Sequence, residues 1–523
     1  MADIKKEQER DELHRAIWAI ADDLRGSVDG WDFKSYVLGT MFYRYISENL
    51  TNYINQGEWD AGNSDFDYAK MSDSEAEEAR EGLIEEKGFF ILPSELFCNV
   101  RKRSPQDENL NETLERVFRN IEDSAKGSVS ENSFAGLFDD FDVNSNKLGA
   151  TVAKRNDKLT KLLNGVGDMK LGDVKDHSID AFGDAYEYLM TMYASNAGKS
   201  GGEFFTPADV SELLTRLGTV GKTEINKVYD PACGSGSLLL KAEKVLGRDA
   251  VRNGFYGQEI NITTYNLCRI NMFLHDVGFD KFDIACEDTL TAPQHWDDEP
   301  FELIVSNPPY SIKWAGDENP LLINDPRFAP AGVLAPKNNA DFAFILHSLS
   351  WLAPNGTAAI VCFPGIMYRG NAEQKIRKYL IDNNFVDCVI QLPSNLFYGT
   401  PIATCIMILK RGKEDNRVLF MDASREFVKV GKNNKLTRTN MDRIVDTFAQ
   451  RREDKHFSHL ASYEEVAEND YNLSVSTYVE AEDPREKIDI QKLNAEIEEI
   501  IAREDVLRRE IAAIIREIEG ADT

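Results

Sequence analysis

Residues 225–237 read Ile-Asn-Lys-Val-Tyr-Asp-Pro-Ala-Cys-Gly-Ser-Gly-Ser. A short β-branched run, 225–230, leads into a glycine-rich bend, and a helical pattern, 238–246, follows. Glycines at such a bend let the backbone approach a ligand and satisfy it with main-chain N–H groups near a helix N-terminus. The pattern suits a nucleotide-like cofactor, although a purely structural tight turn shares it. The predicted cofactor residues in it are Asp230, Pro231, Gly234, Ser235, Gly236 and Ser237.

From about Val174 onward, short β-branched runs alternate with helical patterns on both sides of this bend. This alternation predicts a doubly wound, Rossmann-like α/β domain with a mostly parallel sheet and helices on both faces. In such sheets ligands bind at the carboxyl ends of the strands. The further predicted strands are 254–260, 282–288, 301–306, 357–363, 385–392 and 404–410.

Acidic residues close the next two predicted strands. Glu259 lies 29 residues past Asp230, where a carboxylate can accept hydrogen bonds from both ribose hydroxyls. Asp288 ends the following strand and can accept from the amino group of a cofactor adenine, although an ordinary loop acid is the alternative interpretation. We therefore expect Glu259 and Asp288 to bind the cofactor.

The run 301–306 leads into Asn307-Pro308-Pro309-Tyr310. An exocyclic amine on an aromatic ring is a poor nucleophile because its lone pair is delocalised. The Asn307 side-chain oxygen and the Pro308 carbonyl can hold its hydrogens and favour a more tetrahedral nitrogen aimed at a methyl sulfonium, in a geometry that both prolines keep rigid. Tyr310 can stack on a base flipped out of a duplex. All four residues are predicted to be catalytic, without a metal or a strong base.

Upstream, residues 201–207 read Gly-Gly-Glu-Phe-Phe-Thr-Pro, and Pro207 suits the start of a helix over 208–217. Phe204 or Phe205 can pack on the cofactor, and Thr206 can cap the helix or bind the cofactor carboxylate. Ordinary helix-entry chemistry is the alternative. We expect cofactor contacts from Glu203, Phe204, Phe205, Thr206 and Pro207.

Composition excludes several classes of protein. The formal net charge of −29 is unsuited to holding DNA phosphates unaided, so either DNA is not the substrate or a basic partner helps. The seven cysteines form no CxxC pair, which predicts reduced thiols and no metal centre.

No apolar run reaches eighteen residues and the N-terminus is charged, so we expect a cytoplasmic protein without membrane insertion. Gly198-Lys199-Ser200 is no P-loop, because Tyr193 replaces the required earlier glycine.

Helical patterns flank the α/β part. The predicted domains are therefore 1–170, helical; 171–480, α/β; and 481–523, a coiled-coil-like helix. The last helix either packs back on its own domain or pairs with another subunit. The apolar residues that carry the two patterns are Phe33, Val37, Leu38, Met41, Phe42, Tyr45 and Ile46 in the first, and Leu493, Ile497, Ile500, Leu507, Ile511, Ile514 and Ile518 in the last.

These motifs together resemble the amino-methyltransferases in which a Phe-Thr-Pro motif, a glycine-rich loop and Asn-Pro-Pro-Tyr follow in this order. More closely, the chain is similar to the modification subunits of Type I restriction-modification systems, which methylate adenine N6. The similarity covers nearly the whole chain, including segments 30–33 (Gly-Trp-Asp-Phe), 327–332 (Arg-Phe-Ala-Pro-Ala-Gly), 363–365 (Phe-Pro-Gly), 392–397 (Leu-Pro-Ser-Asn-Leu-Phe) and 470–474 (Asp-Tyr-Asn-Leu-Ser).

The resemblance implies a methyltransferase domain that uses S-adenosyl-L-methionine to methylate adenine in double-stranded DNA. It also implies that two such subunits pair with one specificity subunit, which reads the DNA sequence, and that a motor-nuclease restriction subunit joins for cleavage. The C-terminal helix would pack on the specificity subunit and the N-terminal domain would help clamp DNA. Phe397 is the best match to an aromatic residue that stacks on the flipped base, with Tyr398 second.

Two other functions deserve comparison. Methylation of a protein glutamine or an RNA guanine amine also suits Asn-Pro-Pro-Tyr, but those enzymes are usually compact and lack the flanking helical regions. A catalytically inactive scaffold would have no need for an intact Asn307-Tyr310 motif beside an intact cofactor loop. DNA adenine methylation is therefore the function that accounts for most of these sequence features.

Overall fold

The computed structural model describes residues 2–24, 30–171, 180–196, 206–247, 249–397, 400–481 and 490–520. The chain divides into two units, Met1–Glu480 and Ala481–Thr523. The first unit contains the sheet and the helices around it, and the second contains one long helix.

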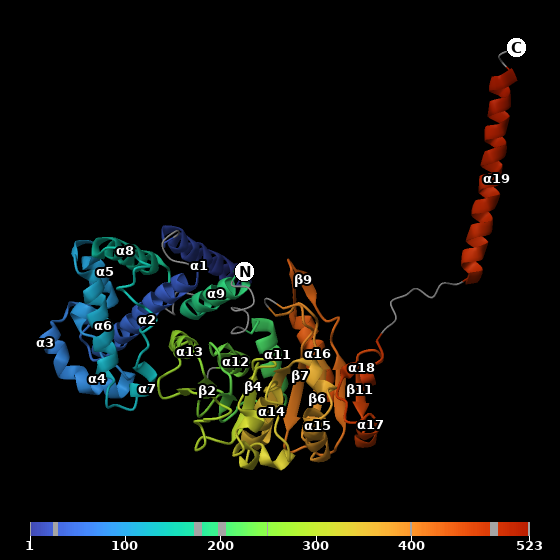
Figure 1. Ribbon diagram of the computed structural model, residues 1–523. Helices are drawn as coiled ribbons and strands as arrows, with labels where there is room; N and C mark the ends of the chain where they lie inside the picture. The colour runs from blue at the N-terminus through green and yellow to red at the C-terminus, as the bar shows by residue number, and fades with distance from the viewer. Residues whose placement is uncertain are drawn as a thin grey trace. The chain divides into compact units, whose positions relative to one another are not determined.

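The first unit is built around a mostly parallel sheet (Figure 1). Its strands are β1 (Val228–Asp230), β2 (Phe255–Glu259), β3 (Phe282–Cys286), β4 (Phe301–Ser306), β5 (Leu352–Cys362), β6 (Val386–Gln391), β7 (Cys405–Lys410), β8 (Val418–Asp422) and β11 (Ser458–Ala461). Their order in the described chain is β11-β8-β6-β7-β5-β4-β1-β2-β3. Strand β7 runs antiparallel to both of its neighbours, and β11 runs antiparallel to β8. A separate hairpin pairs β9 (Val428–Val430) with β10 (Asn433–Lys435).

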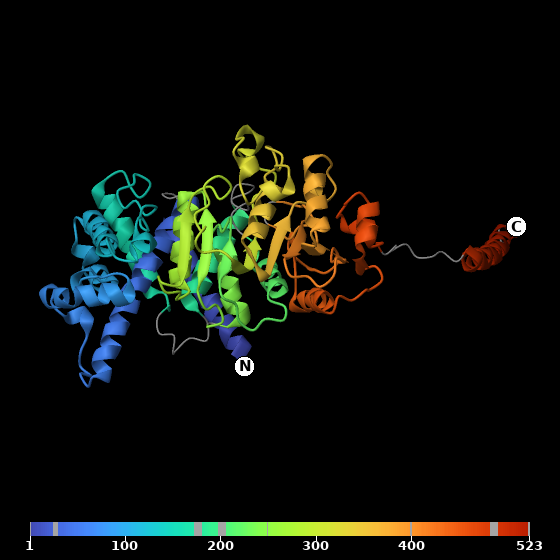
Figure 2. The same ribbon diagram turned by 90° about the horizontal axis from the view of Figure 1, so that it is seen from below.

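Helices cover both faces of this sheet (Figure 2). Those of the α/β part are α11 (Ala208–Gly218), α12 (Ser237–Leu246), α13 (Ile262–Leu274), α14 (Asp341–Trp351), α15 (Ala372–Asp382), α16 (Arg438–Gln450), α17 (Tyr463–Glu468) and α18 (Val475–Tyr478). The N-terminal ones are α1 (Ala2–Leu24), α2 (Gly30–Asp60), α3 (Asp73–Ala76), α4 (Arg80–Lys87), α5 (Phe97–Arg103), α6 (Leu110–Ser124), α7 (Glu131–Phe134), α8 (Val152–Asp168) and α9 (Ala181–Asn196).

Side chains alternate between two buried clusters because successive residues of a strand point to opposite faces. In β4, Leu303 and Val305 join one cluster and Ile304 joins the other. The first cluster contains α11, α12, α13 and the N-terminal helices, whereas the second contains α14 and α15. The expectation of a Rossmann-like sheet covered on both faces is confirmed.

The N-terminal helices share a core with the α/β part through α13. The ring of Phe273 in α13 lies 5.6 Å from that of Phe42 and 4.9 Å from that of Phe134. Polar contacts support the same junction, since Thr263 and Asn266 both donate to the Asp140 carboxylate. The helical spacing read from Asp32 onward is confirmed by α2, in which Val37, Met41 and Phe42 are fully buried.

Each of the predicted strands overlaps an observed strand, but the sheet is larger than predicted. Strand β5 begins at Leu352 rather than Thr357. The turn-like residues Pro354, Asn355 and Gly356 lie within this strand, where its pairing with β4 shifts register. Strands β8 to β11 were not predicted. Within β8 every residue but Asp422 is buried, whereas the short β9 is exposed and the short β10 is exposed or half-buried.

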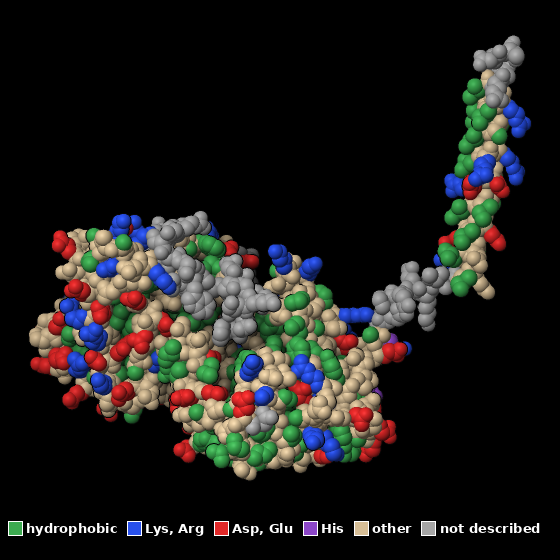
Figure 3. Space-filling view, in the orientation of Figure 1, with side chains coloured by type: hydrophobic (Ala, Val, Ile, Leu, Met, Phe, Trp, Pro, Cys, Tyr) green, Lys and Arg blue, Asp and Glu red, His purple; other side chains and the backbone are tan. Residues whose placement is uncertain are grey.

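The second unit holds α19 (Ile490–Gly520). Its apolar side chains are exposed, and Figure 3 shows them along one side of the helix with charged side chains along the other. No helix in the described parts of the chain is long and apolar enough to span a membrane.

Candidate functional site

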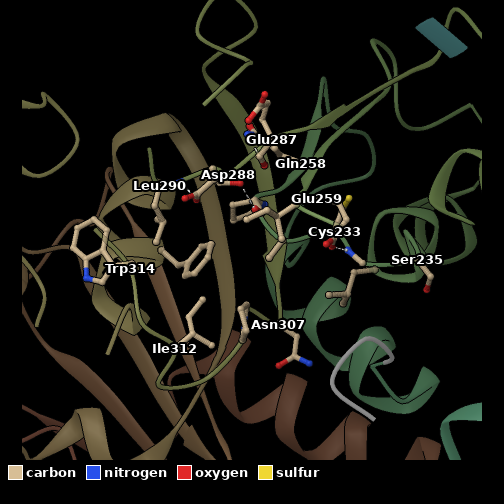
Figure 4. Close-up of a pocket in the computed structure, with 18 of the residues that line it drawn as sticks. Cys233, Ser235, Gln258, Glu259, Glu287, Asp288, Leu290, Asn307, Ile312 and Trp314 are labelled. Carbon is tan, nitrogen blue, oxygen red and sulfur yellow. Dashed lines mark hydrogen bonds between the residues drawn. The ribbon is translucent and has the colours of Figure 1, made fainter. Parts of the chain in front are cut away.

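The site lies where the strand order reverses. Strand β1 pairs with β2 on one side and with β4 on the other, so the chain leaves β1 toward β3 and returns at β4. Loops at the carboxyl ends of β1 and β4 therefore diverge and leave a crevice. A cavity of about 310 Å³ lies there (Figure 4), within the usual size range of small-molecule sites. It is lined by Thr206, Pro231, Ala232, Cys233, Gly234, Ser235, Ser237, Leu238, Gln258, Glu259, Ile260, Glu287, Asp288, Thr289, Leu290, Asn307, Pro309, Ile312, Lys313, Trp314 and Phe344.

The glycine-rich loop forms one wall of the cavity. Its backbone is held by hydrogen bonds from the Cys233 N–H to the Gln258 carbonyl (3.1 Å) and from the Asn271 side chain to the Ser235 carbonyl (2.8 Å). Gly236 has a φ of 79°, and a Cβ there would lie 2.7 Å from the Cys268 sulfur. Gly236 provides no side-chain cap for α12, so the first N–H groups of this helix suit an anionic ligand group.

Asp230 supports the loop from behind the cavity and does not line it. Its Oδ1 accepts hydrogen bonds from the Ala232 N–H (3.0 Å) and the Ser306 hydroxyl (2.7 Å), which joins the ends of β1 and β4. Its Oδ2 is buried and has no hydrogen-bond partner among the described residues. Burial raises the pKa of Asp230 to about 7, because a low-dielectric site disfavours the charged carboxylate.

Glu259 and Asp288 provide the acidic groups of the cavity. The Glu259 oxygens accept from the N–H groups of Gly234 (3.1 Å) and Asn261 (2.9 Å), and burial raises its pKa. The Asp288 oxygens accept from the Leu290 N–H (2.9 Å) and the Thr291 hydroxyl (2.8 Å). A carboxylate has about four acceptor positions, so both side chains are oriented by the protein and retain capacity for a ligand.

Asn307 lies away from Asp288 in the cavity (Figure 4). Its Nδ2 donates to the Thr206 hydroxyl (3.1 Å), and its Oδ1 accepts from the Tyr310 hydroxyl (2.5 Å). Burial holds the pKa of Tyr310 well above its usual value, so this hydroxyl remains a donor. The oxygen predicted to accept from a substrate amine thus already accepts one hydrogen bond from a neighbouring side chain and retains a second lone pair for a ligand.

The cavity brings together many but not all of the predicted residues. Thr206, Pro231, Gly234, Ser235, Ser237, Glu259, Asp288, Asn307 and Pro309 line it. Pro207, Asp230, Gly236, Pro308 and Tyr310 lie outside its lining, and Phe397 is buried. Glu203, Phe204, Phe205 and Tyr398 lie outside the described residues.

Sequence reasoning missed the apolar wall and one polar support. Ile312, Trp314 and Phe344 line the cavity, and the Trp314 indole is held by a hydrogen bond to the Pro336 carbonyl (3.1 Å). An aromatic residue in the loop directly after Asn307-Tyr310 was the signal for Trp314. Gln258 is fully buried and donates to the carbonyls of Glu287 and Ala292 (both 3.0 Å). Its place before Glu259 at the end of β2 was the signal there.

Comparisons with known proteins give consistent matches over nearly the whole chain. Residues 177–487 match the family model described as N-6 DNA Methylase, and residues 13–166 match the HsdM N-terminal domain. The chain is 49% identical to the Type I restriction enzyme MpnII methylase subunit of Mycoplasma pneumoniae, over 98% of this chain and 97% of that protein. It is 34% identical to the HindI methylase subunit of Haemophilus influenzae, over 64% of this chain and 77% of that protein.

Solved structures agree with these relatives. The Type I restriction-modification methyltransferase subunit from Streptococcus thermophilus matches with a TM-score of 0.81 and 35% identity, over 90% of this chain and 100% of that chain. A chain from a structure of a type I restriction-modification system shares the fold, with a TM-score of 0.65 and 19% identity over 98% of both chains. This chain is therefore a DNA methyltransferase of the N-6 DNA methylase family and belongs, within that family, to the methylase subunits of Type I restriction enzymes.

Proposed function

We propose that the chain transfers the methyl group of S-adenosylmethionine to the N6 of adenine in double-stranded DNA. One observation carries this proposal: a single cavity joins the glycine-rich loop and the two acids to the Asn307 turn. A cofactor bound along the loop and an amine held at Asn307 would then meet within one enclosed space, as methyl transfer requires.

The residues present fit S-adenosylmethionine. Glu259 would accept from the ribose hydroxyls and Asp288 from the adenine amine, while Ile312 and Trp314 provide an apolar surface for the adenine ring. The uncapped start of α12 and the Thr206 hydroxyl would receive the carboxylate. When bound, the cofactor supplies an electrophilic methyl group on a sulfonium.

The Asn307 turn would hold the target amine. Its side-chain oxygen and the Pro308 carbonyl would accept the two amine hydrogens. Because an amide oxygen has two lone pairs, the Asn307 oxygen can accept from the amine beside its hydrogen bond from the Tyr310 hydroxyl. The Tyr310 ring would stack on the base, together with Phe397 or Tyr398. Because Phe397 is only 4% exposed, its segment would have to open for this contact. Of the remaining predicted residues, Asp230, Gly236 and Pro207 would shape the cofactor loop and the start of α11.

We further propose that two copies of this chain assemble with one specificity subunit, and that a motor-nuclease subunit joins this complex in the cytoplasm. The net charge of −29 disfavours DNA binding by this chain alone, which supports a basic DNA-reading partner. The exposed apolar side of α19 suits helices of the specificity subunit (Figure 3). Residues 1–170 would help to enclose the DNA beside the α/β domain.

The test is transfer of radiolabelled methyl groups from S-adenosylmethionine to genomic DNA, with and without the proposed specificity subunit. Nucleoside chromatography should place the label in N6-methyladenine only when the partner is present. Label in cytosine would contradict the proposed target atom. Label in protein or RNA but not in DNA under either condition would contradict the proposed substrate.

A further inference from the structure

We infer that Arg327 is a positioning residue for the cofactor, because its buried guanidinium fixes the loop that carries Asp288. This residue opens the Arg327–Gly332 segment, which has no part in the proposed chemistry. The inference rests on the proposed function, since Asp288 is the proposed acceptor for the adenine amine.

Arg327 holds the two residues that follow Asp288. Its Nη1 donates to the Thr289 carbonyl (2.7 Å) and its Nη2 to the Leu290 carbonyl (2.8 Å). The Leu290 N–H in turn donates to the Asp288 carboxylate (2.9 Å). The Thr289 carbonyl and the Leu290 N–H belong to one peptide group. The hydrogen bond from Arg327 to this carbonyl therefore fixes the N–H that orients the Asp288 oxygens toward the cavity.

The guanidinium is itself held rigidly. Asp325 accepts from Nε (3.0 Å) and Nη2 (2.8 Å), and the His347 Nδ1 accepts from Nη1 (3.1 Å). With the two carbonyls, these acceptors use all five N–H donors of an arginine. The rings of Phe328 and Trp296 lie 4.7 Å and 5.5 Å from the guanidinium carbon. Arg327 is only 3% exposed, so the charge has exchanged water for a complete set of partners.

The same network reaches the strand that carries the glycine-rich loop. Burial and the neighbouring Arg327 hold the pKa of His347 well below its usual value, so the ring is neutral. Because its Nδ1 accepts from Arg327, its Nε2 carries the hydrogen and donates to the Tyr229 hydroxyl (2.9 Å). Tyr229 directly precedes Asp230 in β1, and the Thr289 hydroxyl donates to the Pro231 carbonyl (2.6 Å). Arg327 therefore links two walls of the cavity.

A lysine at this position would retain the charge but could not form the fork that reaches two consecutive carbonyls. Arg327→Lys should therefore leave the fold intact and let the Asp288 loop move. We expect the Kd for S-adenosylmethionine to rise about tenfold, which corresponds to about 1.4 kcal/mol. The kcat at saturating cofactor should stay within about twofold, because Arg327 does not touch the Asn307 turn.

The experiment compares wild-type, Arg327→Lys and Arg377→Lys chains by calorimetry, with thermal unfolding as the check on folding. Arg377 is the matched control: it is 1% exposed and donates to the Tyr471 and Ile366 carbonyls (both 2.8 Å), neither of which lines the cavity. Each chain is titrated with S-adenosylhomocysteine and with S-inosylhomocysteine, which lacks the adenine amine that Asp288 would accept.

Arg327→Lys should weaken S-adenosylhomocysteine about tenfold and S-inosylhomocysteine by no more than about twofold, whereas Arg377→Lys changes neither. Equal losses of affinity for both ligands would mean that Arg327 has only a general structural role, and would overturn the inference. Unchanged affinity in Arg327→Lys would also overturn it. If the wild-type chain binds neither ligand, the proposed function fails instead.

Discussion

Asn307 and Asp230 lie at the ends of neighbouring strands but have different roles. Asn307 follows β4 and faces the cavity, whereas Asp230 ends β1 and lies behind it. Each side chain is held by two partners, but only Asn307 offers its polar atoms to a ligand. Substitution of the two residues should therefore affect different measurements.

Asn307→Ala should lower kcat by about a hundred- to a thousandfold, the usual loss when one oriented polar group at a reacting centre is removed. The Kd for S-adenosylmethionine should change by less than about twofold, because Glu259 and Asp288 lie elsewhere in the cavity. The measurement is single-turnover methyl transfer alongside calorimetry. Asn355→Ala, an exposed amide bonded to Glu302, is the control and should change neither value. Wild-type transfer by Asn307→Ala would refute the assigned role.

Asp230→Asn should remove a pH dependence of stability. The pKa of Asp230 in the fold is about 7, above its usual value of 3.8, so the folded state binds more protons than the unfolded state between these values. The free energy of unfolding therefore falls as pH rises from about 4 to about 7. Urea unfolding at several pH values should show this fall in the wild type and a smaller one in Asp230→Asn. Identical slopes would assign the dependence to other groups.

At the scale of elements, the loop between β1 and α12 depends on close packing against α13. The backbone of Gly236 is in the left-handed region and lies against Cys268. The loop therefore takes its shape from a helix more than thirty residues away in the chain. The cost of the left-handed backbone at Gly236 and the cost of its contact with Cys268 should therefore be separable by mutation.

Gly236→Ala should lower the free energy of unfolding by about 1–2 kcal/mol from the left-handed backbone alone, and further because of the contact 2.7 Å from the Cys268 sulfur. Cofactor affinity should fall as well. Adding Cys268→Ala should recover only the steric part of the loss. Gly370→Ala, where a Cβ would meet nothing within 4 Å, is the matched control for urea unfolding. A Gly236→Ala chain as stable as the control would contradict this account.

At the scale of the whole molecule, the chain carries a net charge of −29, which is of the same sign as the charge of DNA. This repulsion makes the chain by itself unsuited to holding DNA. The proposed assembly with a basic specificity subunit would resolve this conflict. The long helix α19, with exposed Leu507 (51%) and Ile511 (56%), offers an apolar surface for that assembly.

Leu507→Asp combined with Ile511→Asp should abolish association with the specificity subunit, because two charges would be buried on one side of the helix. Sedimentation velocity of the mixed subunits measures this. Arg508→Ala, which removes an exposed side chain paired only with Glu504 within the helix, is the control and should still associate. Cofactor affinity should be unchanged in both. Full association of the double variant would exclude this surface.

Much of the α/β part could be predicted from residues close together in sequence. The run before Asp230, the glycines after it and the helix beyond them are a local pattern, and the strand ends at Glu259 and Ser306 follow the same rule. Strands β8 and β11 escaped prediction because their pairing depends on remote partners: β11 pairs with β8 across nearly forty residues. Strands β9 and β10 form a local hairpin, but with three residues each they are too short to show a periodic pattern.

The sequence by itself determined the order of strand, bend and helix, the acids at the strand ends and the Asn-Pro-Pro-Tyr turn, because backbone preferences and side-chain periodicity act over a few neighbouring residues. Only the tertiary structure decided that the Tyr310 hydroxyl donates to the Asn307 oxygen, that Asp230 lies behind the cavity and that Arg327 holds the Asp288 loop. Hydrogen-bond partners in a folded core come from segments far apart in the chain, so a local pattern does not specify them.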